Sequence, residues 1–433
     1  MKLYSTNDTS HIVDLKTAVL KGLPDDNGLY MPCKINPLDK SFYTELGNLS
    51  FEEIAFQVSH QLIGDYIPAS ALRSITDSTV NFEAPLVKLE DNISILELFH
   101  GPSMAFKDFG ARFMSQLMAY FNRGENEELT ILVATSGDTG GAVAAGFYDT
   151  PGINVVILYP SGKVSDIQEK QLTTLGNNIR AIEIDGTFDD CQALVKRAFL
   201  DKELTSHKRL SSANSINIAR LIPQSFYYFE AFKQILPTLK PVVFSIPSGN
   251  FGNLTAGMIA KIMGLPVAKF LAATNTNDII PNYLETGEYS PRPSTRTISN
   301  AMDVGDPSNY KRLADMFKGD GSTWNNMKEM LAGFKYNDAA TLEGIKEIYS
   351  KYEYIMDPHG AIGYLALLDY QKQHDVCGVV LETAHPAKFK DVMDEALKFD
   401  TPIPKKLLSL LGKDKVAIQM GGGYEEFREF LLA

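Results

Sequence analysis

A repeated pattern begins near residue 90: a short apolar run, a loop that contains glycine, and then a stretch with helical periodicity. The runs with the strongest strand character span 129–134, 155–160, 180–185, 241–247, 270–274 and 376–381. Strands that are apolar on both faces and alternate with helices are typical of parallel sheets that helices cover on both sides. The pattern therefore predicts an α/β fold built on parallel-rich sheets.

The chain is too long for one compact core, because its 433 residues exceed the size at which a single hydrophobic core stops growing. Residues 1–90 are mixed and helix-leaning, and the alternating pattern fills the rest. We expect an N-terminal domain over 1–90, a smaller α/β domain over 91–240 and a larger α/β domain over 241–433.

Composition and charge argue against several functional classes. The formal net charge is −12 and neither end carries a run of Lys and Arg, which argues against binding to nucleic acid or to an anionic membrane surface. Cys33, Cys191 and Cys377 lie far apart, without the spacing of a zinc site or a disulfide framework. No segment has the pattern of a secretory signal or the apolar length of a membrane span. We expect a cytoplasmic protein with no metal site.

Lys107 has an unusual setting for a lysine. It follows a Gly-Pro turn and falls in the first turn of an expected amphipathic helix, between Phe106 and Phe109. An ammonium group is costly to bury unless it is paired or its pKa falls, and a lysine with a lowered pKa suits Schiff-base chemistry with a carbonyl cofactor. The residues alone leave a second interpretation open: a lysine whose stem packs while its charge reaches water.

Two loops between an expected strand and an expected helix have the composition of anion sites. They are Ser-Gly-Asn-Phe-Gly-Asn at 248–253 and Thr-Ser-Gly-Asp-Thr-Gly-Gly at 135–141. Each offers main-chain N–H groups at the positive end of a helix dipole, which suits a phosphate or a carboxylate. A tight turn with a helix cap accounts for each loop equally well.

A third polar cluster spans 214–220. Asn214, Ser215 and Asn217 are short donors near an expected helix start, and Arg220 can bind a phosphate through two nitrogens. A capped helix with a surface arginine is the competing interpretation.

Taken together and in this order, the segments resemble the threonine synthases, a family of pyridoxal-phosphate enzymes of fold type II. The resemblance covers nearly the whole chain and points to the longer, bacterial and fungal branch. It rests on Gly-Leu-Tyr-Met-Pro at 28–32, Phe-Lys-Asp-Phe-Gly at 106–110, Ser-Gly-Asp-Thr-Gly at 136–140, Asn-Ser-Ile-Asn…Arg at 214–220, Pro-Ser-Gly-Asn-Phe-Gly at 247–252 and Thr-Ala-His-Pro-Ala-Lys-Phe at 383–389. It implies two open, twisted, parallel-rich sheets covered by helices, with a small N-terminal domain.

The resemblance also implies roles for individual residues. Lys107 matches the catalytic lysine that binds pyridoxal 5'-phosphate covalently, and Thr383 matches the hydroxyl residue that faces the pyridine nitrogen. The residues that match the loop for the cofactor phosphate are Ser248, Gly249, Asn250, Phe251, Gly252 and Asn253. Those that match the substrate site are Ser136, Gly137, Asp138, Thr139, Asn214, Ser215, Asn217 and Arg220. The 91–240 domain would then carry Lys107 and the substrate loops, and the 241–433 domain the cofactor-phosphate loop.

One position departs from the wider fold-type-II pattern. Relatives often have Asn where Asp138 stands, in contact with the phenolic oxygen of the cofactor. A carboxylate would repel a phenolate at that place, so whether Asp138 acts on the cofactor or on the substrate stays open.

The reaction implied by the resemblance converts O-phospho-L-homoserine and water to L-threonine and phosphate, by γ-elimination and β-addition. Lys107 would remove protons at Cα and Cβ while the cofactor delocalises the charge. Rival interpretations are a phospholyase, a threonine dehydratase, a cysteine synthase, and a non-catalytic protein that binds pyridoxal phosphate or a phospho-metabolite. The sequence leaves the choice between a monomer and a homodimer open.

Overall fold

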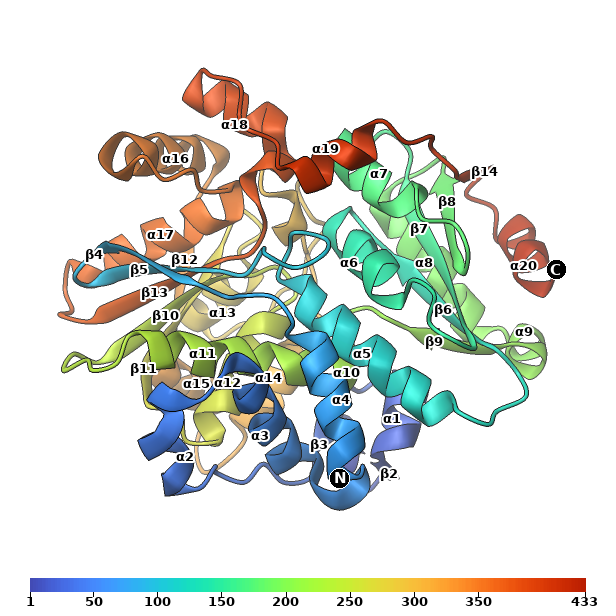
Figure 1. Cartoon of the computed structure of the whole chain (residues 1–433), viewed down its shortest axis with the longest axis horizontal. Helices are drawn as coiled ribbons and strands as arrows, with labels where there is room; N and C mark the ends of the chain where they lie inside the picture. Colours follow the sequence, from blue (N-terminus) through green and yellow to red (C-terminus); the bar gives the residue numbers. More distant parts are fainter.

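Two twisted sheets, one of six strands and one of five, lie side by side with helices against their faces (Figure 1). The structure is a computed structural model that describes residues 1–433. In the six-stranded sheet, every neighbouring pair is parallel except β4 and β5 at one edge. Its order is β12 (Leu331–Lys335), β11 (Val267–Thr274), β10 (Val242–Pro247), β13 (Cys377–Glu382), β5 (Ile93–Glu97) and β4 (Leu86–Glu90).

The five-stranded sheet is parallel throughout. Its order is β14 (Ile418–Met420), β8 (Ile179–Ile184), β7 (Ile153–Pro160), β6 (Leu129–Ala134) and β9 (Arg209–Ser212). Helices α6 and α8 pack on β7, and the chain ends in α20 beyond the edge strand β14 (Figure 1). The helices that accompany this sheet are α5 (Lys107–Asn122), α6 (Asp138–Phe147), α7 (Asp166–Thr173), α8 (Phe188–Leu200), α9 (Lys202–His207) and α20 (Tyr424–Leu432).

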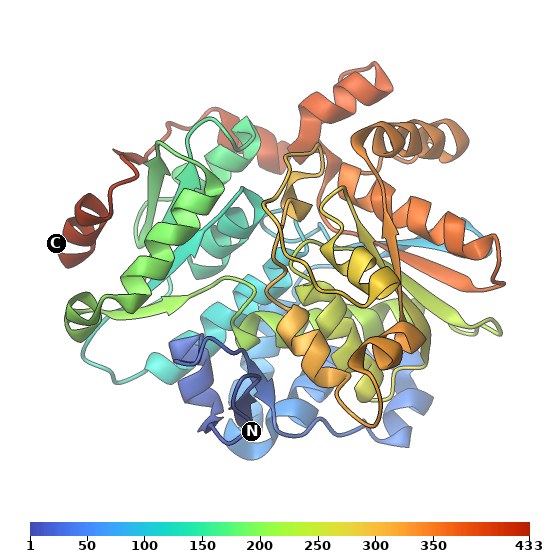
Figure 2. The ribbon, with the colours of Figure 1, turned by 180° about the vertical axis from the view of Figure 1, so that it is seen from behind.

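The first 80 residues form a small antiparallel sheet and four helices that lie along one side of both large sheets, as Figure 2 shows from behind. The sheet consists of β2 (Ile12–Asp14), β1 (Lys2–Ser5) and β3 (Tyr30–Pro32). The helices are α1 (Leu15–Lys21), α2 (Lys40–Glu45), α3 (Phe51–Ile63) and α4 (Ala69–Thr79).

The remaining helices lie mainly against the six-stranded sheet, where α17 packs on β10, β11 and β13. No helix of the chain is long and apolar enough to cross a membrane. The α-helices of this part are α10 (Ile218–Leu221), α11 (Phe226–Gln234), α12 (Gly252–Ile262), α13 (Ile279–Thr286), α14 (Tyr310–Met316), α15 (Thr323–Met330), α16 (Asp338–Tyr352), α17 (Pro358–Gln371), α18 (Lys390–Leu397) and α19 (Lys405–Leu411). Short 3-10 helices occur at Leu46–Asn48, Gly64–Tyr66, Ile222–Ser225, Asn300–Met302 and Pro386–Phe389.

The predicted α/β fold with two parallel-rich sheets and an N-terminal unit is confirmed. Three strands join a sheet from outside the expected range of its domain, the first of them β4, which pairs with β5. β5 pairs with β13 in the six-stranded sheet, and β14 pairs with β8 in the five-stranded one. The polypeptide thus crosses between the two sheets three times: between β5 and β6, where α5 carries Lys107, between β9 and β10, and between β13 and β14.

Helix α5 anchors the site to the core. Phe109, Phe113 and Leu117 recur at helical spacing on one face and are fully buried. Phe109 contacts Tyr227 and Phe51, so this face binds both the central helices and the N-terminal unit. Burial of each such side chain contributes about 1.5–3 kcal/mol. The first turn of α5, with Lys107, is therefore held in a fixed place.

Candidate active site

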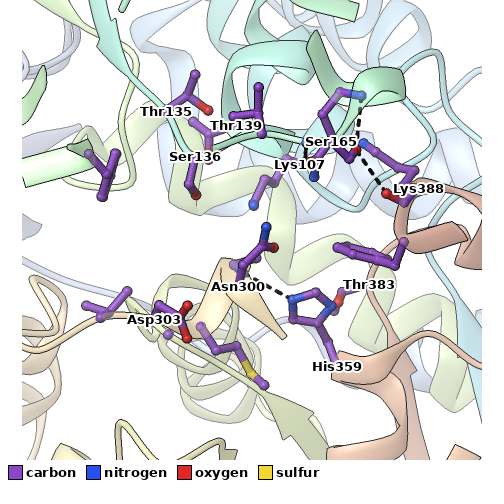
Figure 3. A pocket seen from close by; sticks show the side chains of 18 of the residues that line it. Lys107, Thr135, Ser136, Thr139, Ser165, Asn300, Asp303, His359, Thr383 and Lys388 are labelled. Carbon is purple, nitrogen blue, oxygen red and sulfur yellow. Dashed lines mark hydrogen bonds between the residues drawn. The ribbon is translucent and has the colours of Figure 1, made fainter. Parts of the chain in front are cut away.

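A cavity of about 1150 Å³ lies between the two sheets, where strands β6, β7, β10 and β13 end (Figure 3). The carboxyl ends of parallel strands are the usual place for a ligand in α/β proteins. The structure brings most of the predicted site residues to this cavity. Those that line it are Lys107, Ser136, Thr139, Asn214, Ser215, Arg220, Ser248, Gly249, Asn250, Phe251, Gly252, Asn253 and Thr383.

Lys107 is the first residue of α5, and its side chain is only 16 % exposed. The main-chain N–H of Phe106 donates to the carbonyl of Thr383 at 2.8 Å, which ties the start of α5 to the end of β13. Burial lowers the pKa of Lys107 to about 8, although the Asp138 carboxylate opposes the shift. The amine can therefore lose its proton near neutral pH, as a nucleophile or base must.

The loop after β10 presents main-chain donors to the cavity. Helix α12 begins at Gly252, and its first N–H groups have no partner within the helix. Phe251 holds the turn in the left-handed region with φ 58°, and a Cβ on Gly249 would come 2.9 Å from the carbonyl oxygen of Ala301. The loop therefore needs its small residue at 249, and it forms the kind of cradle that binds a phosphate.

Three side chains of this loop form hydrogen bonds with other groups of the chain. The Ser248 hydroxyl donates to Asn253 Oδ1, and Asn253 Nδ2 donates to the carbonyl of Pro247 at 3.0 Å. Asn250 Oδ1 accepts from the N–H and the hydroxyl of Ser308, at 3.2 and 3.1 Å. The side chains thus shape the loop, and the free donors toward the cavity come from its main chain.

Arg220 supplies a buried cation on the same cavity. Its Nη1 donates to the carbonyl of Ala213 at 2.5 Å, while its buried Nε has no hydrogen-bond partner. Burial lowers its pKa to about 10 against the effect of the Asp108 carboxylate, so the group stays charged at neutral pH. The Nε is packed against Gly110 of α5, so the positive charge of the guanidinium at the cavity wall is what fits an anionic ligand.

Asn214 and Ser215 lie next to Arg220 in the cavity wall. Asn214 Nδ2 donates to the carbonyl of Ala134 at 3.1 Å, which joins this segment to the end of β6. The Ser215 hydroxyl lies 3.5 Å from the hydroxyl of Ser308. Polar groups from both sheets therefore meet at this end of the cavity.

Comparison with known proteins decides the family. Residues 2–80 match the threonine synthase N terminus, residues 80–381 the pyridoxal-phosphate dependent enzymes, and residues 360–431 the threonine synthase C-terminal family. The threonine synthase of Haemophilus influenzae is 46 % identical over the full length of both chains. That of Escherichia coli is 44 % identical over 94 % of each. This chain belongs to the threonine synthase family.

Solved structures agree with this assignment. The threonine synthase structure from Escherichia coli superposes with a TM-score of 0.91, at 41 % identity, over 100 % of this chain and 99 % of that one. A pyridoxal-phosphate-bound threonine synthase from Brucella melitensis gives 0.93 at 34 % identity over the same shares. A maize serine racemase, at 18 % identity and a TM-score of 0.54 over 73 % of this chain, shares the fold. The resemblance stated above is thus confirmed for the family, the fold and the cofactor class.

Three predicted site residues of this threonine synthase family member do not line the cavity. Asn217 is fully buried as the cap of α10: its Oδ1 accepts from the N–H of Ala219 at 3.0 Å, and its Nδ2 donates to the carbonyl of Val19 at 2.9 Å. Gly137 has φ 134° and lies against the Gln168 side chain. Both shape the backbone, because caps and turns use the same short polar residues and glycines as ligand sites.

Asp138 is the third residue set back from the cavity wall. Its Oδ1 accepts from Lys388 Nζ at 2.6 Å and from Gln168 Nε2 at 3.0 Å, and its Oδ2 lies 3.8 Å from Lys107 Nζ. Burial alone would raise the pKa of Asp138, but the two lysines hold it well below its usual range. The carboxylate is therefore ionised and faces cations of the protein.

Three residues that the sequence did not single out shape the site. Lys388 is fully buried and lines the cavity. His359 also lines it: its Nδ1 lies 2.6 Å from Asp357 Oδ1 and its Nε2 accepts from the N–H of Ala301 at 3.2 Å. Arg312 is fully buried and donates to the carbonyls of Ser215, Ile216 and Tyr30, at 3.2, 2.6 and 3.2 Å. Only Lys388 had a local signal, its place in the 383–389 motif.

Proposed function

We propose that this chain is a threonine synthase that converts O-phospho-L-homoserine and water to L-threonine and phosphate with pyridoxal 5'-phosphate. One observation carries the proposal: an amine with a lowered pKa, a main-chain phosphate cradle and a buried, charged arginine line one cavity. The full-length similarity to threonine synthases supports the same reaction.

The residues present fit pyridoxal phosphate. In this proposal Lys107 binds the cofactor covalently, and the loop of Ser248 to Asn253 holds its phosphate through main-chain N–H groups. Thr383 lines the cavity, and its hydroxyl would be the neutral partner of the pyridine nitrogen. When bound, the cofactor supplies an electron sink for the charge that develops on the substrate carbons.

The chain's own residues then hold the substrate and move its protons. The leaving phosphate is bound by Arg220, Asn214 and Ser215. The substrate carboxylate is bound by Ser136 and Thr139 at the start of α6. Lys107 takes the proton from Cα and then one from Cβ. Phosphate leaves Cγ, protons return to Cγ and to Cα, and water adds its hydroxyl at Cβ. The two protons taken from Cα and Cβ and the one left from water are thus shared among Cγ, Cα and the released hydrogen phosphate, which balances the overall reaction.

Product analysis with O-phospho-L-homoserine tests the proposal. We expect threonine and inorganic phosphate in equal amounts, with both products lost in Lys107→Ala. If 2-oxobutyrate is the main product, the chain is a phospholyase and the proposal is wrong. If the purified chain binds pyridoxal phosphate but releases no phosphate, it is a binding protein.

A further inference from the structure

A single buried carboxylate, Asp138, lies between two lysines that come from different elements. Lys107 begins α5, whereas Lys388 lies in the 3-10 helix that follows β13 (Figure 3). Lys388 Nζ is 2.6 Å from Asp138 Oδ1, and Lys107 Nζ is 3.8 Å from Oδ2. We propose that Lys388 is a positioning residue, which engages the Asp138 carboxylate and thereby keeps Lys107 in its neutral, reactive form.

The geometry assigns the carboxylate to Lys388. The Lys388 side chain is 0 % exposed and that of Asp138 is 4 % exposed, so neither charge has water as an alternative partner. Lys388 also donates to the carbonyl of Ser103 at 3.0 Å. Buried charges are stable only when paired, so the two groups form a closed ion pair with little net charge toward Lys107.

Without Lys388 the same carboxylate would have one buried cation left to pair with. Lys107 is at 3.8 Å, and an opposite charge at that distance favours the ammonium form. A protonated Lys107 can neither attack a carbonyl nor remove a proton from carbon. The ion pair with Lys388 also offsets the negative charge that an aspartate brings to this position.

No other charged group around Lys107 takes over the role of Lys388 as the partner of Asp138. Arg220 is a second cation that disfavours a charge on Lys107, and Asp357 is an anion that favours it. Asp357 is itself hydrogen-bonded to His359 Nδ1 at 2.6 Å. Asp138 is the only carboxylate within ion-pair distance of Lys107. The partner of Asp138 therefore determines how strongly this carboxylate favours the ammonium form of Lys107.

The test measures the protonation of Lys107 directly in the full chain without cofactor. A limiting amount of acetic anhydride labels neutral amines, and mass spectrometry gives the labelled fraction of the Lys107 peptide as a function of pH. We expect Lys388→Met and Lys388→Gln to move the midpoint for Lys107 upward by about one pH unit or more, which is about tenfold less neutral amine below the midpoint. Lys388→Arg keeps the cation and should stay near the unmodified protein, while Asp138→Asn should move the midpoint downward.

The matched control is Lys406→Met. Lys406 is exposed and donates to the carbonyl of Gly101 at 2.8 Å, but it has no contact with Asp138, so its loss should leave the midpoint in place. Circular dichroism identifies variants that fold, and Lys388→Gln serves if Lys388→Met does not. An unchanged or lowered midpoint in a folded variant without the Lys388 charge overturns the proposal. The inference uses the Lys107 amine of the proposed function, but the labelling result does not depend on threonine being made.

Discussion

Replacement of Arg220 tests whether the polar end of the cavity binds the substrate phosphate. Arg220→Met removes a buried guanidinium whose Nε has no partner in the chain and whose Nη1 donates only to Ala213. A charge-assisted hydrogen bond contributes about 1.5–3 kcal/mol, so the loss of one or two such bonds should lower kcat/KM by a factor between roughly 10 and roughly 10⁴. Pyridoxal-phosphate loading should change little, because the cofactor phosphate is assigned to the loop of 248–253.

The assay combines steady-state kinetics on O-phospho-L-homoserine with the visible absorbance of bound pyridoxal phosphate. Inhibition by inorganic phosphate adds a measure of ground-state binding, and its inhibition constant should rise in Arg220→Met. Arg112→Met is a suitable control, because it also removes an arginine but one that does not line the cavity. Arg112 lies on α5, and its Nε donates to the carbonyls of Ser78 and Thr79 at 3.1 and 3.2 Å. Equal losses of cofactor loading and of turnover in Arg220→Met would refute a substrate role for Arg220.

Three further outcomes follow from the same geometry. Borohydride reduction of the loaded protein should fix a pyridoxyl group on Lys107. The rate of cofactor attachment should rise with pH up to about 8 and then level off, because the pKa of Lys107 is about 8 and lies below the ordinary 10.5. A labelled peptide elsewhere, or a rate that still rises past pH 10, would contradict the assignment. Gly249→Ala should weaken cofactor binding in equilibrium dialysis, because its Cβ would come 2.9 Å from the Ala301 carbonyl; unchanged affinity would show that the loop relaxes freely. Asn217→Ala should lower the free energy of unfolding, measured in urea titrations, by about 0.5–2 kcal/mol, because α10 loses its N-cap. The KM should not change. A large rise in KM without a loss of stability would return Asn217 to the substrate site.

Local sequence signals were sufficient for the parts of the site that local structure builds. The loop of 248–253 could be predicted because a glycine turn between a strand and a helix start has its own composition, and the structure places it in the cavity wall. Lys107 stood out because a lysine between two phenylalanines at a helix start conflicts with the usual preference of charge for water. The structure resolves that conflict through burial beside Asp138.

The same signals failed where two uses of a residue look alike. Asn217 carries the donors of a ligand site, yet its side chain is fully engaged by Ala219 and Val19. Strand β5 precedes Lys107 directly, but its place beside β13 depends on hydrogen bonds to residues far along the chain. The local sequence shows neither whether Asn217 caps a helix or binds a ligand nor which sheet β5 joins.

By itself, the sequence determined the α/β class, the alternation that puts loops at the ends of parallel strands, and the residue types for a covalent cofactor and an anion. Each of these depends on neighbours in sequence: apolar periodicity, glycine at a turn, donors at a helix start. Which charges meet depends on contacts between distant segments of the folded chain. Asp138 and Lys388 lie on elements of different sheets, and their pairing at 2.6 Å requires both sheets to close on one cavity. Because a buried charge is stable only opposite its partner, this contact, absent from any local pattern, sets the electrostatics around Lys107.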